Sequence, residues 1–414
     1  MTASVASLAY ALKSLWPQER VKNEVYPDHP FLAMISKTED FYGDGIYIAV
    51  RTGDPQGRSA SFANAQTISG ASSALGNAGA QRGVRFYIQR VSDYQVVNLT
   101  TEAILAAKRD EGALIRSLDT EMKAGVNNIG KSLATALFRG QTGSIGVIGA
   151  ITATTITLSN INDVTSYEIG MRLVASATAT GANRSTPATA DITGVNRDTG
   201  VLTFGAGTFT GTNWAAADFI FSQGDNANGT GSGNKVQGLA DWIPSTTPTS
   251  TTFNGVDRSV DPTRLGGLRI DISAFMPEEG LITVLSKQAR EGGRPSHLFC
   301  NHADYRNIML SLGSKVENEY VAVGDIGFEA LKVRGPKGVV AVVADQDCPQ
   351  GSGWSLDMSS WKLASLEGCP QILDMDGAQL SRVYNADQFE ARIAYFANTW
   401  CDAPGFNTYV TMPT

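Results

Sequence analysis

The chain has 414 residues, of which 42% are hydrophobic and 18% are charged, and this composition is typical of a folded protein with two or three domains. The net charge of -7 argues against a general nucleic-acid-binding protein, which would carry a basic face. No uninterrupted apolar run reaches about eighteen residues, so no membrane span is expected. The four cysteines form no Cys-x-x-Cys pair, and this pattern favours a reduced, cytosolic protein.

Residues 1–40 are predicted to form an N-terminal arm. Apolar residues at helical spacing predict a short amphipathic helix at its start: Val5, Leu8, Leu12 and Leu15. Such a helix packs either on its own domain or on another surface, and the sequence leaves both open. Three prolines then predict an extended path over a surface: Pro17, Pro27 and Pro30.

Two alternating segments, residues 46–51 and 84–89, predict the strands of a long hairpin. The segment between them is rich in Ala, Ser, Gly and Asn, and it is unusually long for a turn inside a compact domain. Fully extended, the hairpin would reach roughly 60 Å. It is therefore either a disordered insertion or a segment ordered against a neighbouring subunit, and we favour the second interpretation.

A helix of nearly forty residues is predicted over 101–139, with Thr101 as its N-cap and Gly140 just beyond its end. Its apolar stripe is Leu114, Leu118, Met122, Val126, Ile129, Leu133 and Leu137. Three glycines lower its helix propensity, so tertiary packing must stabilise it: Gly112, Gly125 and Gly130. A coiled coil is the other possibility, but the stripe departs from a strict heptad repeat.

Residues 146–223 are rich in Thr, Ala, Gly and Val, and they predict an inserted small β-barrel or sandwich. Within it, the segment from Asn196 to Gly200 predicts a hairpin turn. A Gly/Asn-rich run over 224–235 predicts a flexible exit. In the mixed remainder we expect helices over 262–275 and 277–291 and from near Asp304, and strands over 298–301, 339–345 and 388–400.

No catalytic, cofactor or metal site is predicted. His297, Cys300 and His302 lie close in sequence, but 297 and 300 would point to opposite faces of a strand. The pair Asp374 and Asp376 begins like a calcium loop but lacks the glutamate at its twelfth position. The triplet Gly130-Lys131-Ser132 falls within the predicted helix and is not interpreted as a phosphate-binding loop. No arrangement of base, nucleophile and oxyanion site is recognisable, so the protein is predicted not to be an enzyme.

The order of these elements resembles that of tailed-bacteriophage major capsid proteins with the HK-97-like fold. Three segments are similar to parts of that family: residues 252–267, 297–309 and 348–363. In the second of these the matching pattern is a strand, an asparagine and a helix with an aromatic residue: Leu298, Phe299, Asn301, Tyr305 and Ile308. The resemblance covers nearly the whole chain apart from the 146–223 insertion.

The resemblance implies an α+β fold with an N-arm, an E-loop hairpin, a peripheral domain with a long spine helix, an axial domain and, here, an inserted small all-β domain. The expected limits are 1–40 for the N-arm, 41–95 for the E-loop, 96–145 for the peripheral domain, 146–235 for the inserted β domain, 236–365 for the axial domain and 366–414 for the return to the peripheral domain.

The resemblance also implies a function. The chain is expected to self-assemble, through hexamers and pentamers, into the icosahedral shell around a phage's double-stranded DNA. Expected partners are further copies of itself, a separate scaffolding protein, a portal, a decoration protein, and packaged DNA through nonspecific contacts. No cofactor and no membrane are expected. Localisation would be the virion capsid, after assembly in the host bacterial cytoplasm.

Residues 38–107 contain no lysine, so the lysine–asparagine cross-link known in the family, in which the E-loop supplies the lysine, is not expected here. Charged contacts between subunits are instead assigned to hairpin arginines: Arg51, Arg58, Arg82, Arg85 and Arg90. Trp16 and Tyr26 are predicted as aromatic anchors of the arm on another subunit. The competing interpretation, based on the Thr/Gly-rich middle, is a β-rich virion surface protein or tail-fibre-like adhesin.

Overall fold

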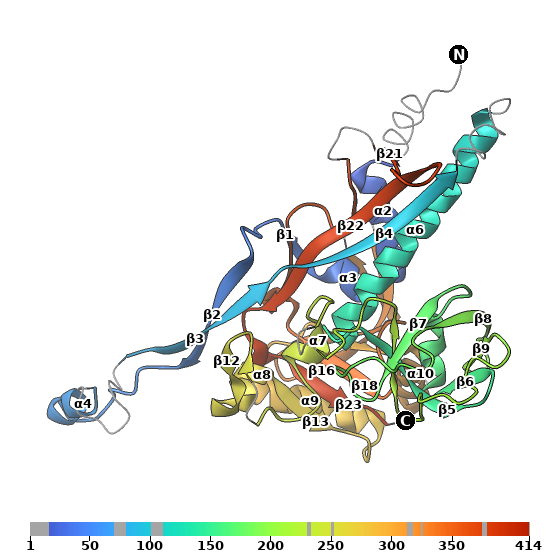
Figure 1. Ribbon diagram of the computed structural model, residues 1–414. Coiled ribbons are helices and arrows are strands. Elements are labelled where there is room, and N and C mark those ends of the chain that lie inside the picture. The colour runs from blue at the N-terminus through green and yellow to red at the C-terminus, as the bar shows by residue number, and fades with distance from the viewer. Residues whose placement is uncertain are drawn as a thin grey trace.

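The computed structural model describes residues 16–69, 80–100, 111–229, 233–249, 252–312, 318–323, 326–374 and 379–413. Figure 1 shows a body built from two β-sheets, a β-barrel and a long helix, with a hairpin that projects far from it. The α+β class predicted from the sequence is confirmed. The predicted domain limits stay predictions.

The described part of the arm is helical rather than extended. It contains α2 (Gln18–Val25), a 3-10 turn η1 (Tyr26–Asp28), α3 (Pro30–Met34) and the short strand β1 (Ser36–Thr38). The prediction of an extended path was therefore wrong. Pro17 is the N-cap of α2 and Pro30 is the first residue of α3, positions where the missing N–H and the fixed φ of proline favour the start of a helix. The predicted helix before Pro17 lies outside the described residues.

The predicted hairpin is present as β2 (Gly45–Gly53) and β3 (Arg82–Gln89), which pair antiparallel. A short helix, α4 (Phe62–Ser69), lies at its far end (Figure 1). The next strand, β4 (Val91–Thr100), leaves the hairpin and enters the body.

The long helix is α6 (Glu111–Arg139), and it ends at Gly140 with a φ of 90°, as predicted. The predicted N-cap Thr101 lies outside the described residues. The helix lies along a sheet that we call the peripheral sheet (Figure 1). Its central strand is β22 (Gln388–Cys401), which pairs with β4, β19 (Trp361–Ser365), β20 (Gln371–Ile372) and β21 (Ser381–Arg382), while β1 pairs with β19.

After α6 the chain forms a closed six-stranded barrel, in the order β10-β5-β6-β9-β8-β7. Its strands are β5 (Ser144–Ile151), β6 (Thr155–Leu158), β7 (Arg172–Ser176), β8 (Ala190–Asn196), β9 (Val201–Phe204) and β10 (Phe219–Ser222), with a 3-10 turn η3 (Ile161–Ser166). The barrel has its own core, which includes Tyr167, Phe204 and Trp214. The predicted turn after Asn196 connects β8 to β9, where Gly200 adopts a φ of 66°.

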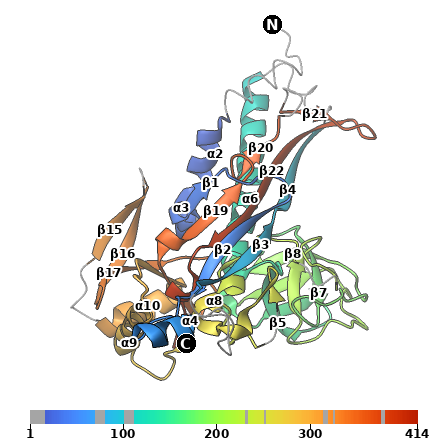
Figure 2. The same ribbon diagram turned by 90° about the vertical axis from the view of Figure 1, so that its left-hand side faces the viewer.

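The remaining strands form a seven-stranded mixed sheet, the axial sheet. Its order is β13 (Leu268–Asp271), β23 (Thr408–Thr411), β18 (Ser352–Leu356), β14 (His297–Cys300), β17 (Gly338–Ala344), β16 (Ile326–Gly335) and β15 (Asn318–Val323). Two helices accompany it, α9 (Pro277–Arg290) and α10 (His302–Leu312). Figure 2 shows β15–β17 and the barrel on opposite sides of the body.

The helix predicted over 262–275 is wrong. The structure has a short helix, α8 (Pro262–Gly266), followed directly by β13. Gly267 has a φ of 74°, which ends the helix. The smaller elements of this part are α7 (Leu239–Trp242), the two-stranded hairpin of β11 (Thr252–Phe253) and β12 (Val256–Asp257), and the 3-10 turns η4 (Arg258–Val260), η6 (Met358–Ser360) and η7 (Pro404–Phe406).

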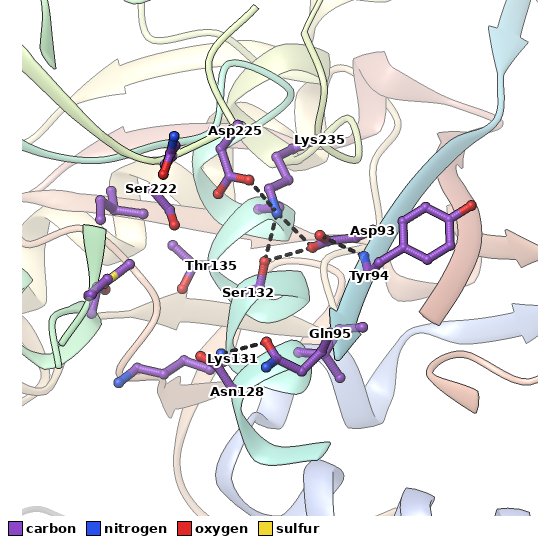
Figure 3. Close-up of a pocket in the computed structure, with 18 of the residues that line it drawn as sticks. Asp93, Tyr94, Gln95, Asn128, Lys131, Ser132, Thr135, Ser222, Asp225 and Lys235 are labelled. Carbon is purple, nitrogen blue, oxygen red and sulfur yellow. Dashed lines mark hydrogen bonds and ion pairs between the residues drawn. The ribbon is translucent and has the colours of Figure 1, made fainter. Parts of the chain in front are cut away.

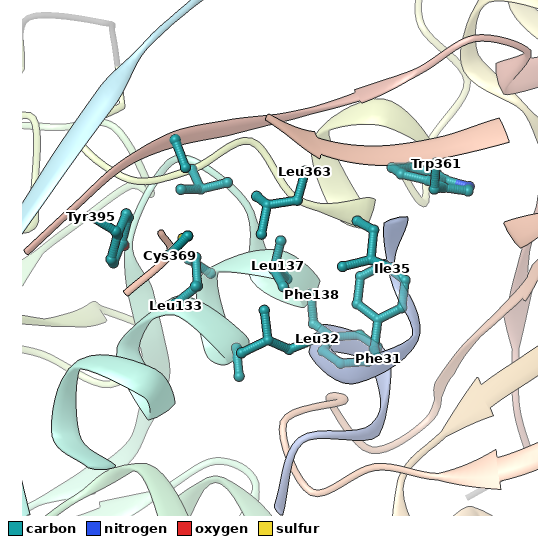
Figure 4. Packing of buried hydrophobic residues seen from close by; sticks show 14 of the residues in the cluster. Phe31, Leu32, Ile35, Leu133, Leu137, Phe138, Trp361, Leu363, Cys369 and Tyr395 are labelled. Carbon is teal, nitrogen blue, oxygen red and sulfur yellow. The ribbon is translucent and has the colours of Figure 1, made fainter. Parts of the chain in front are cut away.

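The main core lies where the arm, α6 and both sheets meet (Figure 4). Phe31 of α3 is at its centre, with its ring centroid 5.3 Å from that of Phe138 on α6 and 5.1 Å from that of Phe299 on β14. Trp361 of β19 lies 6.5 Å away on the same cluster. The arm is therefore an integral part of the body's core.

The glycines of α6 allow close packing, as the sequence suggested. A Cβ on Gly125 would lie 2.7 Å from a methyl group of Val97 on β4 and 3.0 Å from one of Ile393 on β22. Gly125→Ala is expected to lower the free energy of unfolding by about 1–3 kcal/mol, although alanine favours the helix by about 1 kcal/mol, because the packing has no room for a methyl group. Thermal denaturation checks this, with the exposed Asn127→Ala as control. Equal or higher stability of Gly125→Ala would contradict the packing argument.

Candidate functional site

The projecting hairpin has two different faces. Strand alternation puts Val50, Phe86 and Ile88 on the face that packs on the body, and all three are buried. The opposite face carries Tyr47, which is 65% exposed, and its cross-strand neighbour Tyr87, with 4.8 Å between the ring centroids. The outer face thus offers aromatic surface that its own chain leaves open to solvent.

The far end of the hairpin is even less buried by its own chain. Helix α4 has no buried residue, and its Phe62 is 83% exposed. An isolated helix of 8 residues is marginal in water, because most helical stability in proteins comes from tertiary packing. Among the described residues, α4 therefore has no packing surface that buries any of its side chains.

The hairpin arginines predicted for intersubunit contacts lie along this projection. Four of them are exposed: Arg51, Arg58, Arg82 and Arg85. Arg51 forms an exposed ion pair of 3.2 Å with Asp54, and the Arg85 guanidinium lies 5.7 Å from the centroid of the Tyr47 ring. Arg90, at the hairpin base, donates a hydrogen bond of 2.7 Å to the Gly43 carbonyl. Their contacts with other subunits stay a prediction.

The two aromatic residues predicted as anchors lie in the body. Trp16 is 2% exposed in the main core, with Arg20 stacked 4.2 Å from its ring centroid. Tyr26 donates a hydrogen bond of 3.2 Å to the Cys369 carbonyl, and its ring packs against the core. In this conformation both side chains contact their own chain, and their contacts with another subunit stay a prediction.

A groove of about 1290 Å³ separates β4 and α6 from the barrel (Figure 3). Lys235 closes it at one side, with its Nζ 2.6 Å from Asp93 Oδ2, 3.1 Å from Asp225 Oδ1 and 2.9 Å from Ser132 Oγ. Burial alone would lower the pKa of Lys235, but the two carboxylates outweigh it and the pKa is raised. The charged Lys235 thus connects the segment that follows the barrel to β4, through Asp93, and to α6, through Ser132.

A second junction fastens the barrel to the end of the long helix. Arg139 of α6 forms an ion pair of 2.5 Å with Asp163 of η3, and both side chains are largely buried. Asn162 of the same turn donates a hydrogen bond of 2.6 Å to Gln350, next to the axial sheet. These contacts hold the barrel in a defined orientation on the body.

A buried acidic cluster joins the arm to the axial sheet. His29 Nδ1 lies 2.5 Å from Asp347 Oδ2, and the Phe31 N–H donates a hydrogen bond of 3.1 Å to Asp345 Oδ2. Burial acts to lower the pKa of His29, but Asp347, with Asp345 and Asp28 nearby, raises it overall. Burial has the opposite effect on a carboxyl group and, with Asp347 nearby, raises the pKa of Asp345 to about 7. The folded cluster therefore binds protons more strongly than the unfolded chain does.

This cluster predicts a pH dependence of stability. The His29 contribution is complete below its unfolded pKa of 6.5 and is lost as the pH rises through its higher folded value. His29→Gln is therefore expected to lower the free energy of unfolding by roughly 1–3 kcal/mol at pH 6 and by less at pH 9. Urea titrations at both values check this, with His297→Gln as control. An equal loss at both pH values would contradict a charged His29.

The other residues considered for chemistry are not gathered into a site. His297 begins β14 and stacks on Phe299 at 6.0 Å between ring centroids, Cys300 is buried, and His302 begins α10. In the described ranges, no group of three or more His, Cys, Asp or Glu side chains is arranged to hold a metal ion. Asp376 lies outside the described residues. None of the described helices combines the length and the apolar character needed to cross a bilayer.

The segment GVNNIGKS, residues 125–132, does have the residue spacing of a phosphate-binding loop, because Gly125 stands at the required distance before Gly130. All of it lies inside α6. The N–H groups of a helix interior donate to carbonyls four residues earlier and cannot surround a phosphate. A Cβ on Gly130 would lie 2.6 Å from Val25 of α2, so this glycine serves the packing of two helices.

Sequence reasoning missed the polar residues that hold the hairpin at its base. Three side-chain amides meet there, those of Gln237, Asn254 and Asn398. The one sequence signal was the Asn254-Gly255 pair, which is typical of a tight hairpin turn and connects β11 to β12. Gln237 and Asn398 are not part of a sequence pattern that would predict their contacts at the hairpin base.

Comparison with known proteins gives one family match. The family model of the SU10 major capsid protein matches residues 215–379, which include the last barrel strand and most of the axial sheet. No curated protein matches the chain in sequence.

Several solved structures are similar over most of the chain. The capsid of cyanophage A-1(L) has a TM-score of 0.48 and 10% identity, covering 95% of this chain and 94% of that chain. The native GTA particle capsid has a TM-score of 0.46 and 9% identity, covering 92% and 90%. A structure from Mycobacterium phage Ogopogo has a TM-score of 0.42 and 9% identity, covering 94% and 93%. The match of the family model over residues 215–379 confirms the predicted similarity to a phage major capsid protein and supports a shell-forming role.

Proposed function

We propose that this chain is the major capsid protein of a tailed phage and that it self-assembles into an icosahedral shell around double-stranded DNA. The observation that carries the proposal is the projecting hairpin (Figure 1), whose outer face and α4 expose aromatic and arginine side chains to solvent. The match to a major capsid family over 215–379 supports it.

Assembly follows from many weak contacts. Each hairpin would lie across a neighbouring subunit, with its arginines facing acidic groups and its aromatic residues packed on apolar surface. Each contact is weak alone, but every subunit gives and receives several, so closing hexamers, pentamers and the shell multiplies their effect. The assembled protein would be found in the virion capsid, after assembly in the host cytoplasm.

Further partners follow from the same function. A scaffolding protein, a portal and a decoration protein would act with the shell. Contacts with packaged DNA would be few and nonspecific, because the net charge of -7 gives the chain an overall repulsion from phosphates.

Electron microscopy of the purified chain tests the proposal. We expect rings of five or six subunits or closed icosahedral particles. A monomer or an elongated trimer without rings or shells would contradict the proposal and would favour the β-rich adhesin.

The shell is expected to be noncovalent, because the hairpin has no lysine between residues 38 and 107. Particles boiled in detergent should therefore run on a denaturing gel as a single chain of 43.9 kDa. A ladder of multiples of this mass would show covalent cross-links and would contradict the prediction.

A further inference from the structure

At the base of the hairpin, two backbone groups on the free edge of β3 form hydrogen bonds with the body. The Tyr87 N–H donates a hydrogen bond of 2.9 Å to the Asn254 carbonyl, and the Gln89 carbonyl accepts one of 2.6 Å from Asn398 Nδ2. One edge of β3 pairs with β2, and the backbone groups of residues 87 and 89 lie on the other edge. The body therefore binds β3 at two successive positions along this unpaired edge.

These two points belong to one network of amides. Gln237 Nε2 donates to Asn254 Oδ1 at 2.7 Å, and Asn254 Nδ2 donates back to Gln237 Oε1 at 2.8 Å. The Gln237 main-chain N–H donates to Asn398 Oδ1 at 2.9 Å. We call Gln237, Asn254 and Asn398 the amide relay. It connects the β11–β12 hairpin, the segment before α7 and β22 to a single strand of the projecting hairpin.

Two of the three relay side chains are buried, so the loss of one of their hydrogen bonds would be costly in free energy. Gln237 is 7% exposed and Asn398 is 1% exposed. Asn254 adopts a φ of 50°, which puts its carbonyl and its side chain in reach of β3 and Gln237 together. A rotation of the hairpin would break at least one of these bonds and leave a buried polar group without a partner, which is costly.

An apolar contact accompanies the relay. The Phe86 ring centroid lies 5.2 Å from that of Trp242 and 6.2 Å from that of Phe253. Apolar burial is not directional, so this cluster holds the hairpin against the body without selecting an angle, whereas hydrogen bonds depend on direction. The directional part of the attachment thus consists of the relay and of the hydrogen bond of 2.6 Å that Arg264 Nη1, on α8, donates to the Thr52 carbonyl of β2.

Small changes of angle at this base are amplified along the hairpin. Strand β2 has 9 residues, which at about 3.3 Å each gives an arm of roughly 30 Å. A swing of about 10° at the base would therefore move the far end of β2 by about 5 Å, more than a hydrogen bond or an aromatic contact tolerates. The Arg264 bond to Thr52, near this end, limits the same swing.

We infer that the amide relay, together with the Arg264 bond to Thr52, sets the direction in which the hairpin projects, and that the members of the relay are positioning residues for assembly. The second half of this inference rests on the proposed capsid function, while the first concerns the single chain alone.

The test measures the hairpin's direction before assembly. Nitroxides on Ala60→Cys, in the hairpin, and Ser286→Cys, on α9, report one distance distribution by pulsed electron resonance on the full-length, unassembled chain. The four native cysteines are buried and leave the introduced thiols as the labelling sites. Gln237→Met keeps the volume and the main-chain bonds of Gln237 but removes both amide bonds to Asn254 and the bond of 3.3 Å from Gln237 Nε2 to Gln141 Oε1.

Gln237→Met is expected to shift or broaden the distance distribution by about 5 Å, and its particles should become fewer and irregular in size. Gln350→Met is the matched control, because it removes an amide-to-amide bond of 2.6 Å between the barrel and the axial part, and it should leave the distribution unchanged. Should Gln237→Met fail to fold, Asn254→Gly removes the same pair at a half-exposed position and keeps the positive φ.

An unchanged distribution in a folded relay variant would overturn the inference. A broadened distribution with normal shells would overturn the link to assembly. If the unaltered chain forms no shells while the distances still respond, the capsid proposal fails and the relay's control of direction stands.

Discussion

Replacing residues 54–81 with an Asn-Gly turn is expected to abolish shell formation and to leave the chain folded. The pairing of β2 with β3 runs from Gly45 with Gln89 to Gly53 with Arg82, so a two-residue turn can close the hairpin just beyond its last pair. The removed part includes α4, which has no buried residue, so the free energy of unfolding should change by less than about 0.5 kcal/mol.

The measurement is particle yield by electron microscopy and sedimentation, together with circular dichroism of the unassembled chain. Phe62→Ala is a milder variant that removes the largest exposed apolar group of α4 without shortening the hairpin, and it should reduce the yield of particles. Normal shells from the shortened chain would refute the assembly role of the hairpin's far end.

Phe31→Ala is expected to give the largest loss of stability among single substitutions in the core. Its ring meets Phe138, Phe299 and Trp361, which come from the long helix and from both sheets. Truncating a buried phenylalanine removes its burial and leaves a cavity, at a cost of about 3–5 kcal/mol. Because the arm, α6 and both sheets share this cluster, the arm should also become sensitive to proteolysis.

Urea unfolding monitored by tryptophan fluorescence measures this loss. Phe62→Ala is the matched control, because it is the same substitution at an exposed site and should change the free energy of unfolding by less than about 0.5 kcal/mol. Equal stabilities of the two variants would mean that the arm does not pack into the core as Figure 4 shows.

The elements with strong periodic patterns could be predicted from the sequence. The alternation at 46–51 and 84–89 predicted β2 and β3, because one face of the hairpin base packs on the body and the other is exposed. The stripe from Met122 to Leu137 predicted α6 for a similar reason. In both cases burial on one side leaves a regular pattern in the chain itself.

The two wrong predictions concern residues whose effect depends on context. The prolines of the arm predict an extended path, yet Pro17 and Pro30 each stand at the start of a helix, where proline is favoured. The sequence alone does not distinguish a proline that starts a helix from one that prevents it. In the segment 262–275, the apolar residues fit helical spacing, but Gly267 at a positive φ ends the helix and the strand β13 pairs with β23, far away in sequence.

The candidate site was only partly predictable. The hairpin and its arginines follow from local sequence, whereas the amide relay joins positions 237, 254 and 398, and the groove is formed by β4, α6 and the barrel. Single polar residues brought together by the fold leave no local pattern. Burial of Trp16 and Tyr26 in their own chain likewise depends on helix α2 and the turn η1, which the sequence analysis did not predict.

A mixed-isotope cross-linking experiment tests most directly whether the hairpin contacts sister subunits. Particles are assembled from equal amounts of ordinary and nitrogen-15-labelled chains that carry a photoreactive phenylalanine at position 62, and cross-linked peptides are weighed after illumination. If the hairpin lies on a neighbouring copy, about half of the cross-linked pairs will combine one light and one heavy peptide. Pairs that are all light or all heavy would show that the hairpin contacts only its own chain, and the account would be wrong.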